Sequence, residues 1–271
     1  MPTPPPTGPL VTRDTVSTQL RLLGVETGET LLVHSSLSSL GWVNGGAVAA
    51  VQGLLDALGP AGTLVVPTQS GDLSDPAVWG NPPVPDEWWD RIRATMPAYD
   101  PLITPSRGVG VIPETVRTWP GALRSAHPQT SFAALGPRAA EIVDAHAPDC
   151  RLGERSPLAR LERLGARVLL LGAGYDACTS FHLAEYRIPS PLVPVGRPAP
   201  GGGWETVTEV SITSDRFDEL GHDFERDRPV VRGRVGAADA RLFPVADAVA
   251  YAERWLALHR PREEEFPHPR T

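Results

Sequence analysis

The chain has 271 residues and a mass of 29.0 kDa, which is long enough to bury the core of one large α/β domain or of two small ones. Hydrophobic residues make up 41% and charged residues 21%, as in an ordinary globular protein, and no stretch approaches the roughly 20 apolar residues that span a bilayer. The net charge is −7 and all 25 basic residues are arginines, which argues against a nucleic-acid partner and excludes lysine-dependent chemistry.

The N-terminus and the cysteines indicate the compartment. The first ten residues, MPTPPPTGPL, have neither the basic start nor the apolar run of a secretory signal. Two cysteines are too few for a disulfide framework or a Cys-rich zinc module. We therefore expect a cytoplasmic protein with no membrane partner. Its single domain would span residues 12–260, between a disordered tail at 1–11 and a Glu- and Pro-rich tail at 261–271.

A strand–helix–strand unit is predicted near the start of the chain. It follows a helix that stops at Gly24. Residues 30–34 and 63–67 read as short buried strands, and residues 45–58 carry apolar side chains at helical spacing between them. This order predicts two neighbouring parallel strands with a right-handed crossover.

A long irregular segment, rich in proline and tryptophan, is predicted from residue 68 to residue 105. Loops of this length in compact domains usually serve as lids or binding loops. The segment contains Trp79, Trp88, Trp89 and Tyr99, which could instead form a small satellite core.

The remaining elements complete an α/β pattern. A helix carrying His182 and Glu185 is expected to begin near residue 179, and residues 190–204 read as a variable Gly- and Pro-rich region. Helices are also predicted at 110–119, 137–146, 156–164 and 245–259, and strands at 168–171 and 206–212. We predict a single α/β domain with a mixed, largely parallel central sheet flanked by helices.

Two predicted strands end in residues that could carry chemistry, which is where α/β folds place their sites. The first strand runs into SSLSS at 35–39, where hydroxyls and free amides could hold a phosphate, although serines also make ordinary caps and turns. Beyond the strand at 168–171, His182 and Glu185 stand three apart on one helix face, where a histidine can act as a general base or simply cap the helix.

Other chemistries have weaker signals. Cys178 precedes His182 by four residues, so a thiol nucleophile is conceivable. Gly172-Ala173-Gly174 lacks the third glycine of a dinucleotide fingerprint. The seven histidines are scattered without metal-ligand spacing, so we expect no metal.

Seven segments, in order and over most of the chain, resemble the aminoglycoside N3-acetyltransferases, the antibiotic N-acetyltransferase family. They are LVHSS at 32–36, GTLVVPT at 62–68, YDPLITP at 99–105, RGVG at 107–110, RSAHP at 124–128 with SF at 131–132, GERSPL at 153–158, and VLLLG at 168–172 with TSFHLAE at 179–185. One position departs from the pattern, because Cys178 stands where the family commonly has Asn.

The resemblance implies transfer of acetyl from acetyl-CoA to the 3-amino group of the 2-deoxystreptamine ring of aminoglycoside antibiotics, and hence antibiotic resistance. Attack on the thioester would be direct, with His182 as general base and Glu185 orienting it. The residues expected to bind the cofactor are His34, Ser35, Ser36, Leu37, Ser106, Arg107, Gly108, Val109 and Gly110. Those expected to bind the cationic amine are Asp72, Asp176 and Glu185, with Asp75 a further candidate.

Three alternatives stay open. A relative of the same family could acylate an amine that is not an aminoglycoside. The chain could also be a non-catalytic CoA or small-ligand binding protein, or a nicotinamide or methyl-donor enzyme built on Gly172-Ala173-Gly174. A homodimer is compatible with each of them.

Overall fold

The computed structural model describes residues 8–260, so residues 1–7 of the tail expected at 1–11, and the whole tail expected at 261–271, lie outside the described residues. Val11, which the sequence analysis assigned to the N-terminal tail, is buried and forms a parallel bridge with Val43. This residue therefore belongs to the packed part of the chain.

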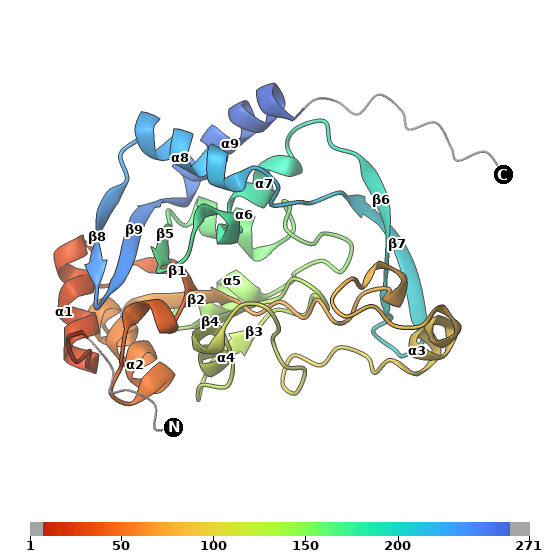
Figure 1. The fold of residues 1–271 in the computed structure, drawn as a ribbon, viewed down its shortest axis with the longest axis horizontal. Coiled ribbons are helices and arrows are strands. Elements are labelled where there is room, and N and C mark those ends of the chain that lie inside the picture. Colours follow the sequence, from red (N-terminus) through yellow and green to blue (C-terminus); the bar gives the residue numbers. More distant parts are fainter. Residues whose placement is uncertain (1–7, 261–271) are drawn as a thin grey trace, which may run out of the picture.

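The strands form one large sheet and a separate hairpin (Figure 1). Within residues 8–260 they are β1 (Thr30–Ser35), β2 (Thr63–Pro67), β3 (Leu123–Arg124), β4 (Phe132–Leu135), β5 (Arg167–Leu171), β6 (Leu192–Pro198), β7 (Trp204–Val210), β8 (Val231–Val235) and β9 (Ala238–Pro244). The order in the sheet is β3-β4-β2-β1-β5-β9-β8, and β6 pairs with β7.

The parallel pairs of the large sheet are confined to its three central strands. β1 pairs in parallel with β2 and with β5, and the outer strands add in antiparallel fashion on both sides. The predicted α/β fold with a mixed sheet is confirmed. The strand–helix–strand unit near the start of the chain is confirmed as well, because Thr30 of β1 lies opposite Thr63 of β2.

Helices cover both faces of this sheet. Those in the described residues are α1 (Arg13–Leu23), α2 (Gly46–Leu58), α3 (Trp89–Thr95), α4 (Val111–Arg117), α5 (Ala139–Val143), α6 (Pro157–Arg163), α7 (Phe181–Glu185), α8 (Phe217–Asp227) and α9 (Val245–His259). One hydrophobic cluster joins α1, α2 and α4 to one face, and another joins α5 to α9 to the opposite face. Among residues 8–260, no helix combines the length and the apolar composition that crossing a bilayer requires.

The central strands are apolar on both sides because each faces a helix layer on each side. Along β5, Val168 and Leu170 belong to one cluster, whereas Leu169 and Leu171 belong to the other. All four side chains are fully buried. A continuous apolar run in the sequence is therefore the expected signature of this strand.

Several elements differ from the sequence prediction. The Gly- and Pro-rich region at 190–204 contains β6, which is paired along its whole length with β7. Five other elements, β3, β4, α8, β8 and β9, were not predicted at all. β8 was missed because four of its five residues are exposed, so it shows no apolar alternation.

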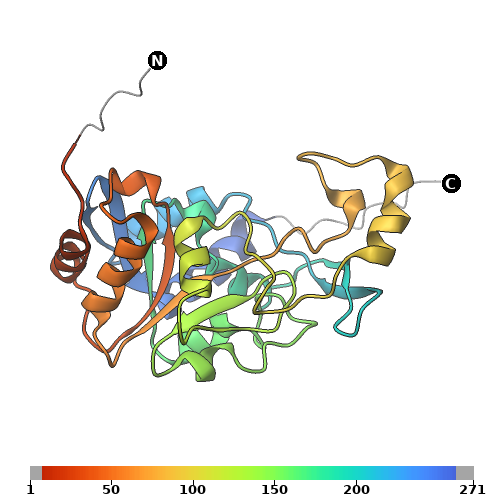
Figure 2. The same ribbon diagram turned by 90° about the horizontal axis from the view of Figure 1, so that it is seen from below.

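The segment from 68 to 105 is not irregular throughout, because it contains α3 and two single turns of 3₁₀-helix. The alternative of a satellite core is wrong, since Trp88 is 55% exposed and none of the other three aromatic residues, Trp79, Trp89 and Tyr99, is buried. Figure 2 shows α3 and the β6–β7 hairpin together at one end of the molecule, away from the sheet.

Candidate active site

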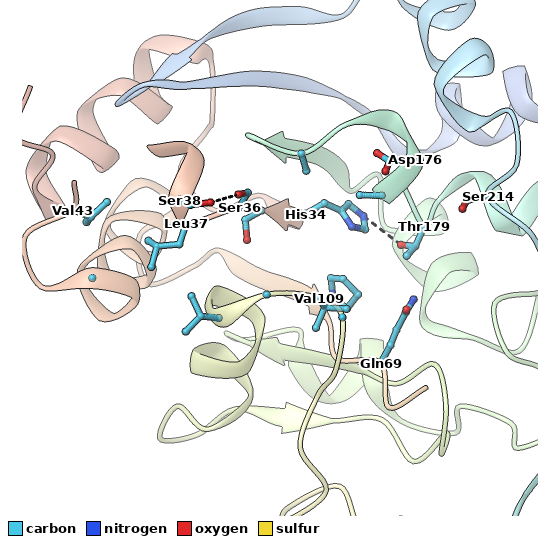
Figure 3. Close-up of a pocket in the computed structure, with 18 of the residues that line it drawn as sticks. His34, Ser36, Leu37, Ser38, Val43, Gln69, Val109, Asp176, Thr179 and Ser214 are labelled. Atoms are coloured by element: carbon cyan, nitrogen blue, oxygen red, sulfur yellow. Dashed lines mark hydrogen bonds between the residues drawn. The ribbon is translucent and has the colours of Figure 1, made fainter. Parts of the chain in front are cut away.

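The two predicted strand ends meet. β1 and β5 are adjacent and parallel, with Ser35 opposite Leu171, so their carboxyl ends lie at the same edge of the sheet. A cavity of about 890 Å³ lies beside this edge. The segment after β1 lines one side of it, and the residues between β5 and α7 line the other (Figure 3).

Most of the residues predicted for the site line this cavity. They are His34, Ser35, Ser36, Leu37, Gly108, Val109, Gly110, Asp176 and His182. The predicted site residues that do not line it are Ser106, Arg107, Asp72 and Glu185, and neither does the further candidate Asp75, which forms a salt bridge with Arg93. The fold therefore brings the serine segment, the glycine segment and the histidine together, although they are far apart in the sequence.

His182 and Glu185 form a hydrogen-bonded pair at the cavity wall. Their i, i+3 spacing on α7 places Nδ1 of His182 2.6 Å from Oε2 of Glu185. The His182 side chain is 13% exposed, whereas that of Glu185 is completely buried. An ionised carboxylate can only accept, so Nδ1 carries the proton and Nε2 retains the lone pair. The pair therefore presents one proton-accepting nitrogen.

The expectation that Glu185 also contacts the amine substrate is wrong. Its carboxylate lies behind the imidazole rather than in the cavity, with no exposed surface. Oε2 is occupied by His182, and Oε1 accepts a 3.1 Å hydrogen bond from the backbone N–H of Thr213. Glu185 can act only through the groups that it holds.

His34 contributes a neutral ring to the same wall. It is the second-to-last residue of β1, is almost completely buried, and has Nε2 3.3 Å from the Thr179 hydroxyl (Figure 3). Burial, reinforced by the proximity of His182, lowers the pKa of His34 to about 3. At neutral pH His34 is therefore uncharged and links β1 to the segment that leads into α7.

The serine segment after β1 offers uncharged polar groups. Ser36 Oγ lies 3.1 Å from Ser38 Oγ and 3.0 Å from Ser39 Oγ, and Ser39 Oγ is also 3.2 Å from the carbonyl oxygen of Gly172. A short 3₁₀-helix begins at Ser38, and the first N–H groups of any helix lack partners within it. Ser35 Oγ is buried without a hydrogen-bond partner among the described residues. These donors suit an anionic or polar ligand.

Of the other exceptions, Ser106 and Arg107 lie on the segment that leads to α4, and Asp72 lies in the segment that follows β2. Arg107 forms a 2.7 Å salt bridge with Asp72, outside the cavity. The Ser106 hydroxyl donates a 2.6 Å hydrogen bond to Glu114, which also pairs with Arg117. Burial alone would raise the pKa of Glu114, but these partners lower it to about 2. Ser106 thus anchors the glycine segment, and the expectation of direct ligand contacts from these residues has no support in the geometry.

The cysteine alternative fails on burial. Cys178 is fully buried and does not line the cavity. Burial raises the pKa of its thiol to about 12, so it is not a thiolate at neutral pH. Among residues 8–260, no group of three or more His, Cys, Asp or Glu side chains is arranged to hold a metal ion.

Sequence reasoning missed several residues that line the cavity. Trp42 and Val43 lie between β1 and α2, Gln69 follows β2, and Ser214 precedes α8. The sequence did offer a signal that Trp42 lines the cavity, because this large aromatic residue closely follows the polar serine segment. Ser214 had none, since only the packing of the loop before α8 brings it to the cavity (Figure 3).

Comparison with known sequences gives a consistent result. A family model described as aminoglycoside 3-N-acetyltransferase matches residues 32–257. The chain is 47% identical over 254 residues to the SPbeta prophage-derived aminoglycoside N(3')-acetyltransferase-like protein YokD of Bacillus subtilis (strain 168), covering 90% of this chain and 92% of that protein. It is 37% identical over 267 residues to aminoglycoside N(3)-acetyltransferase VIII of Streptomyces fradiae, covering 91% and 92%.

Solved structures agree with these matches. The crystal structure of YokD from Bacillus subtilis has a TM-score of 0.92 at 45% identity, covering 95% of this chain and 97% of that one. The acetyltransferase AAC-IIIb, solved as a binary complex with CoASH, has a TM-score of 0.78 at 31% identity, covering 92% and 97%.

Proposed function

The chain belongs to the aminoglycoside 3-N-acetyltransferase family and is an acyltransferase, and from this premise we propose that it transfers acetyl from acetyl-CoA to the 3-amino group of the 2-deoxystreptamine ring of an aminoglycoside. The observation that carries the proposal is the His182–Glu185 pair at the wall of the cavity. An aliphatic amine is mostly ammonium at neutral pH, so it must lose a proton before it can attack a thioester.

That first proton leaves to the solvent, and as the neutral amine forms the C–N bond with the acyl carbon, His182 takes on Nε2 the second proton that the nitrogen loses. Glu185 accepts the hydrogen bond from Nδ1–H throughout, which holds the ring in one tautomer and stabilises the imidazolium once it forms. Bound acetyl-CoA supplies an activated acyl carbon and a thiol leaving group. The proton on Nε2 is then available to the departing sulfur. No enzyme nucleophile is needed, in keeping with the burial of Cys178.

The donor would lie along the serine and glycine segments. Ser36 and Leu37 line the cavity, and so do Gly108 to Gly110. Gly110 has φ = +88°, and a Cβ there would stand 3.5 Å from the carbonyl oxygen of Ser35. The solved complex of AAC-IIIb with CoASH supports a CoA thioester as the donor.

The acceptor would enter beside Asp176. This side chain is exposed and lines the cavity, together with His182 and Ser214. A carboxylate near the base attracts an ammonium group and so favours a cationic acceptor.

An amine that is not an aminoglycoside is a second candidate. Asp176 is the one carboxylate among the described residues that line the cavity. An aminoglycoside carries several ammonium groups, so a single carboxylate also suits an acceptor with fewer charges.

Steady-state turnover tests these proposals. The full chain is incubated with acetyl-CoA and kanamycin, CoA release is followed with a thiol reagent, and the product is assigned by NMR. Turnover at the 3-amino group, with a loss of roughly 10²–10⁴-fold in His182→Ala, supports the proposal. His222→Ala, which replaces an exposed histidine on α8, is the control and should retain full activity.

Other outcomes separate the candidates. Turnover only with amines outside the aminoglycosides would favour the second candidate. Binding of acetyl-CoA without turnover of any acceptor in a broad amine panel would indicate a binding protein and overturn the proposal.

A further inference from the structure

The carboxylate of Glu185 has a second charged partner. Its Oε1, the oxygen that does not contact His182, accepts a hydrogen bond from Nη1 of Arg260. Arg260 directly follows α9 and is 75 residues from Glu185 in the sequence. Its side chain is 22% exposed, so this ion pair is shielded from water on the Glu185 side. A buried carboxylate is stable in its ionised form only when such partners compensate for lost hydration.

Arg260 also holds the surroundings of the histidine. Its Nη2 donates to the carbonyl oxygens of Thr213 at 2.6 Å and Asp215 at 3.0 Å, on either side of the cavity residue Ser214. The guanidinium carbon lies 5.4 Å from the centre of the Phe217 ring. The centre of that ring is 4.8 Å from the centre of the His182 imidazole. Arg260 therefore contacts three groups that surround His182: the Glu185 carboxylate, the loop around Ser214 and the Phe217 ring.

The charges around the imidazole are few. In the described part of the chain, the ion-pair partners of Glu185 are His182 and Arg260 alone. His34 faces His182 from β1 in its neutral form, and Asp176 lines the same cavity from the segment before α7. When His182 becomes protonated, two cations therefore share one carboxylate. The positive charge of Arg260 opposes protonation of the ring.

We propose that Arg260 is a positioning residue of the active site, which keeps Glu185 ionised and oriented so that His182 presents Nε2 to the cavity and releases its proton readily. This inference rests on the proposed function. Arg260, which directly follows α9, would then be the third member of a group whose other two members are the His182–Glu185 pair on α7.

The test compares Arg260→Met with Arg260→Lys in the full chain. Methionine keeps much of the apolar stem and removes the charge, whereas lysine restores the charge without the fork of donors. For Arg260→Met, kcat should fall about 10–100-fold while KM for acetyl-CoA changes less than about 3-fold. The acidic limb of the kcat profile should move to higher pH by about 0.5–1 unit. Arg260→Lys should recover part of both effects.

Arg216→Met is the matched control. Arg216 also ties the end of α9 to the same loop, through His259 O and the Trp255 ring, but it pairs with Glu219 and does not contact Glu185. This variant should keep both kcat and the pH profile. An unchanged acidic limb in Arg260→Met, or an equal change in Arg216→Met, would show that Arg260 acts only as structural support.

NMR separates this proposal from the proposed function. In ¹⁵N-histidine-labelled protein, the His182 ring should titrate at higher pH in Arg260→Met than in the unmodified chain, whether or not any acceptor is turned over. The same titration in both proteins would overturn the positioning role, even if acetyl transfer were established.

Discussion

Asp72 and Arg107 bind each other. The resemblance assigned Arg107 to the cofactor and Asp72 to the amine, yet their side chains form a 2.7 Å salt bridge outside the cavity. Both are largely exposed, so the pair contributes little to stability. Because each charge is already neutralised by the other, the charge that a cationic acceptor meets in the cavity is that of Asp176.

Replacement of Asp176 should therefore weaken acceptor binding, whereas replacement of Asp72 should not. A contact between a carboxylate and an ammonium group at a partly exposed site is worth about 1 kcal/mol, which is roughly a 5-fold rise in acceptor KM for Asp176→Asn. Asp72→Asn, measured under the same conditions, should leave acceptor KM within about 2-fold of the unmodified value. The opposite ranking of the two variants would contradict the assignment of the acceptor to the Asp176 side.

The charge of Glu185 should be needed for catalysis. In Glu185→Gln the side chain keeps its shape, but its NH₂ group can donate to Nδ1 and so favour the wrong tautomer of His182. We expect kcat to fall roughly 10²–10⁴-fold with little change in either KM. Glu154→Gln, which removes an exposed partner of Arg187, is the control. Because the change also leaves Arg260 without its carboxylate, melting temperatures must be measured alongside the rates.

A side chain at Gly110 should interfere with the donor. Gly110→Ala places a Cβ beside Ser35 at a position with φ = +88°, which costs about 1 kcal/mol of stability through backbone strain. KM for acetyl-CoA should also rise several-fold. Gly24→Ala imposes a similar strain at φ = +103° where no atom lies within 4 Å, so it should lower stability without affecting KM. Equal KM values for the two variants would indicate that the donor does not pass Gly110.

His146 should make the protein less stable in acid. It is buried away from the cavity, with Nδ1 3.0 Å from Ser125 Oγ and Nε2 2.9 Å from the carbonyl oxygen of Arg151. Burial, together with neighbouring His127, lowers its pKa to about 3, against about 6.5 in an unfolded chain. Below pH 6.5 the unfolded state therefore binds a proton that the folded state does not.

The free energy of unfolding should consequently fall by up to about 1.4 kcal/mol per pH unit for this residue, from about pH 6.5 down to about pH 3. Urea unfolding at several pH values tests this prediction. His146→Gln should show a shallower decline over the same range than the unmodified chain, whatever its absolute stability. Parallel curves would mean that His146 is already protonated in the folded protein.

Local sequence predicted the parts of the protein that depend on local rules. The Thr12 side chain accepts a hydrogen bond from the backbone N–H of Thr15 at the start of α1, and Gly24 ends the helix in the left-handed conformation. Both residue types are typical of these positions. The same holds for β1, β2 and β5, because strands buried on both faces need continuous apolar runs. His182 and Glu185 were paired correctly for the same reason, since a spacing of three residues is sufficient to align them on one helix.

Tertiary structure decided what depends on distant residues. The exposed side chains of β8 carry no pattern, and this strand exists because β9 offers it a hydrogen-bonding edge. Arg107 forms a salt bridge with Asp72, and Arg260 contacts Glu185, which is 75 residues away in the sequence. Both contacts exist because the packing of the whole chain brings these side chains together. The residue types and their order therefore determined the family, the three central strands and the His182–Glu185 pair, whereas the charge environment of that pair was set by long-range contacts, which no local pattern records.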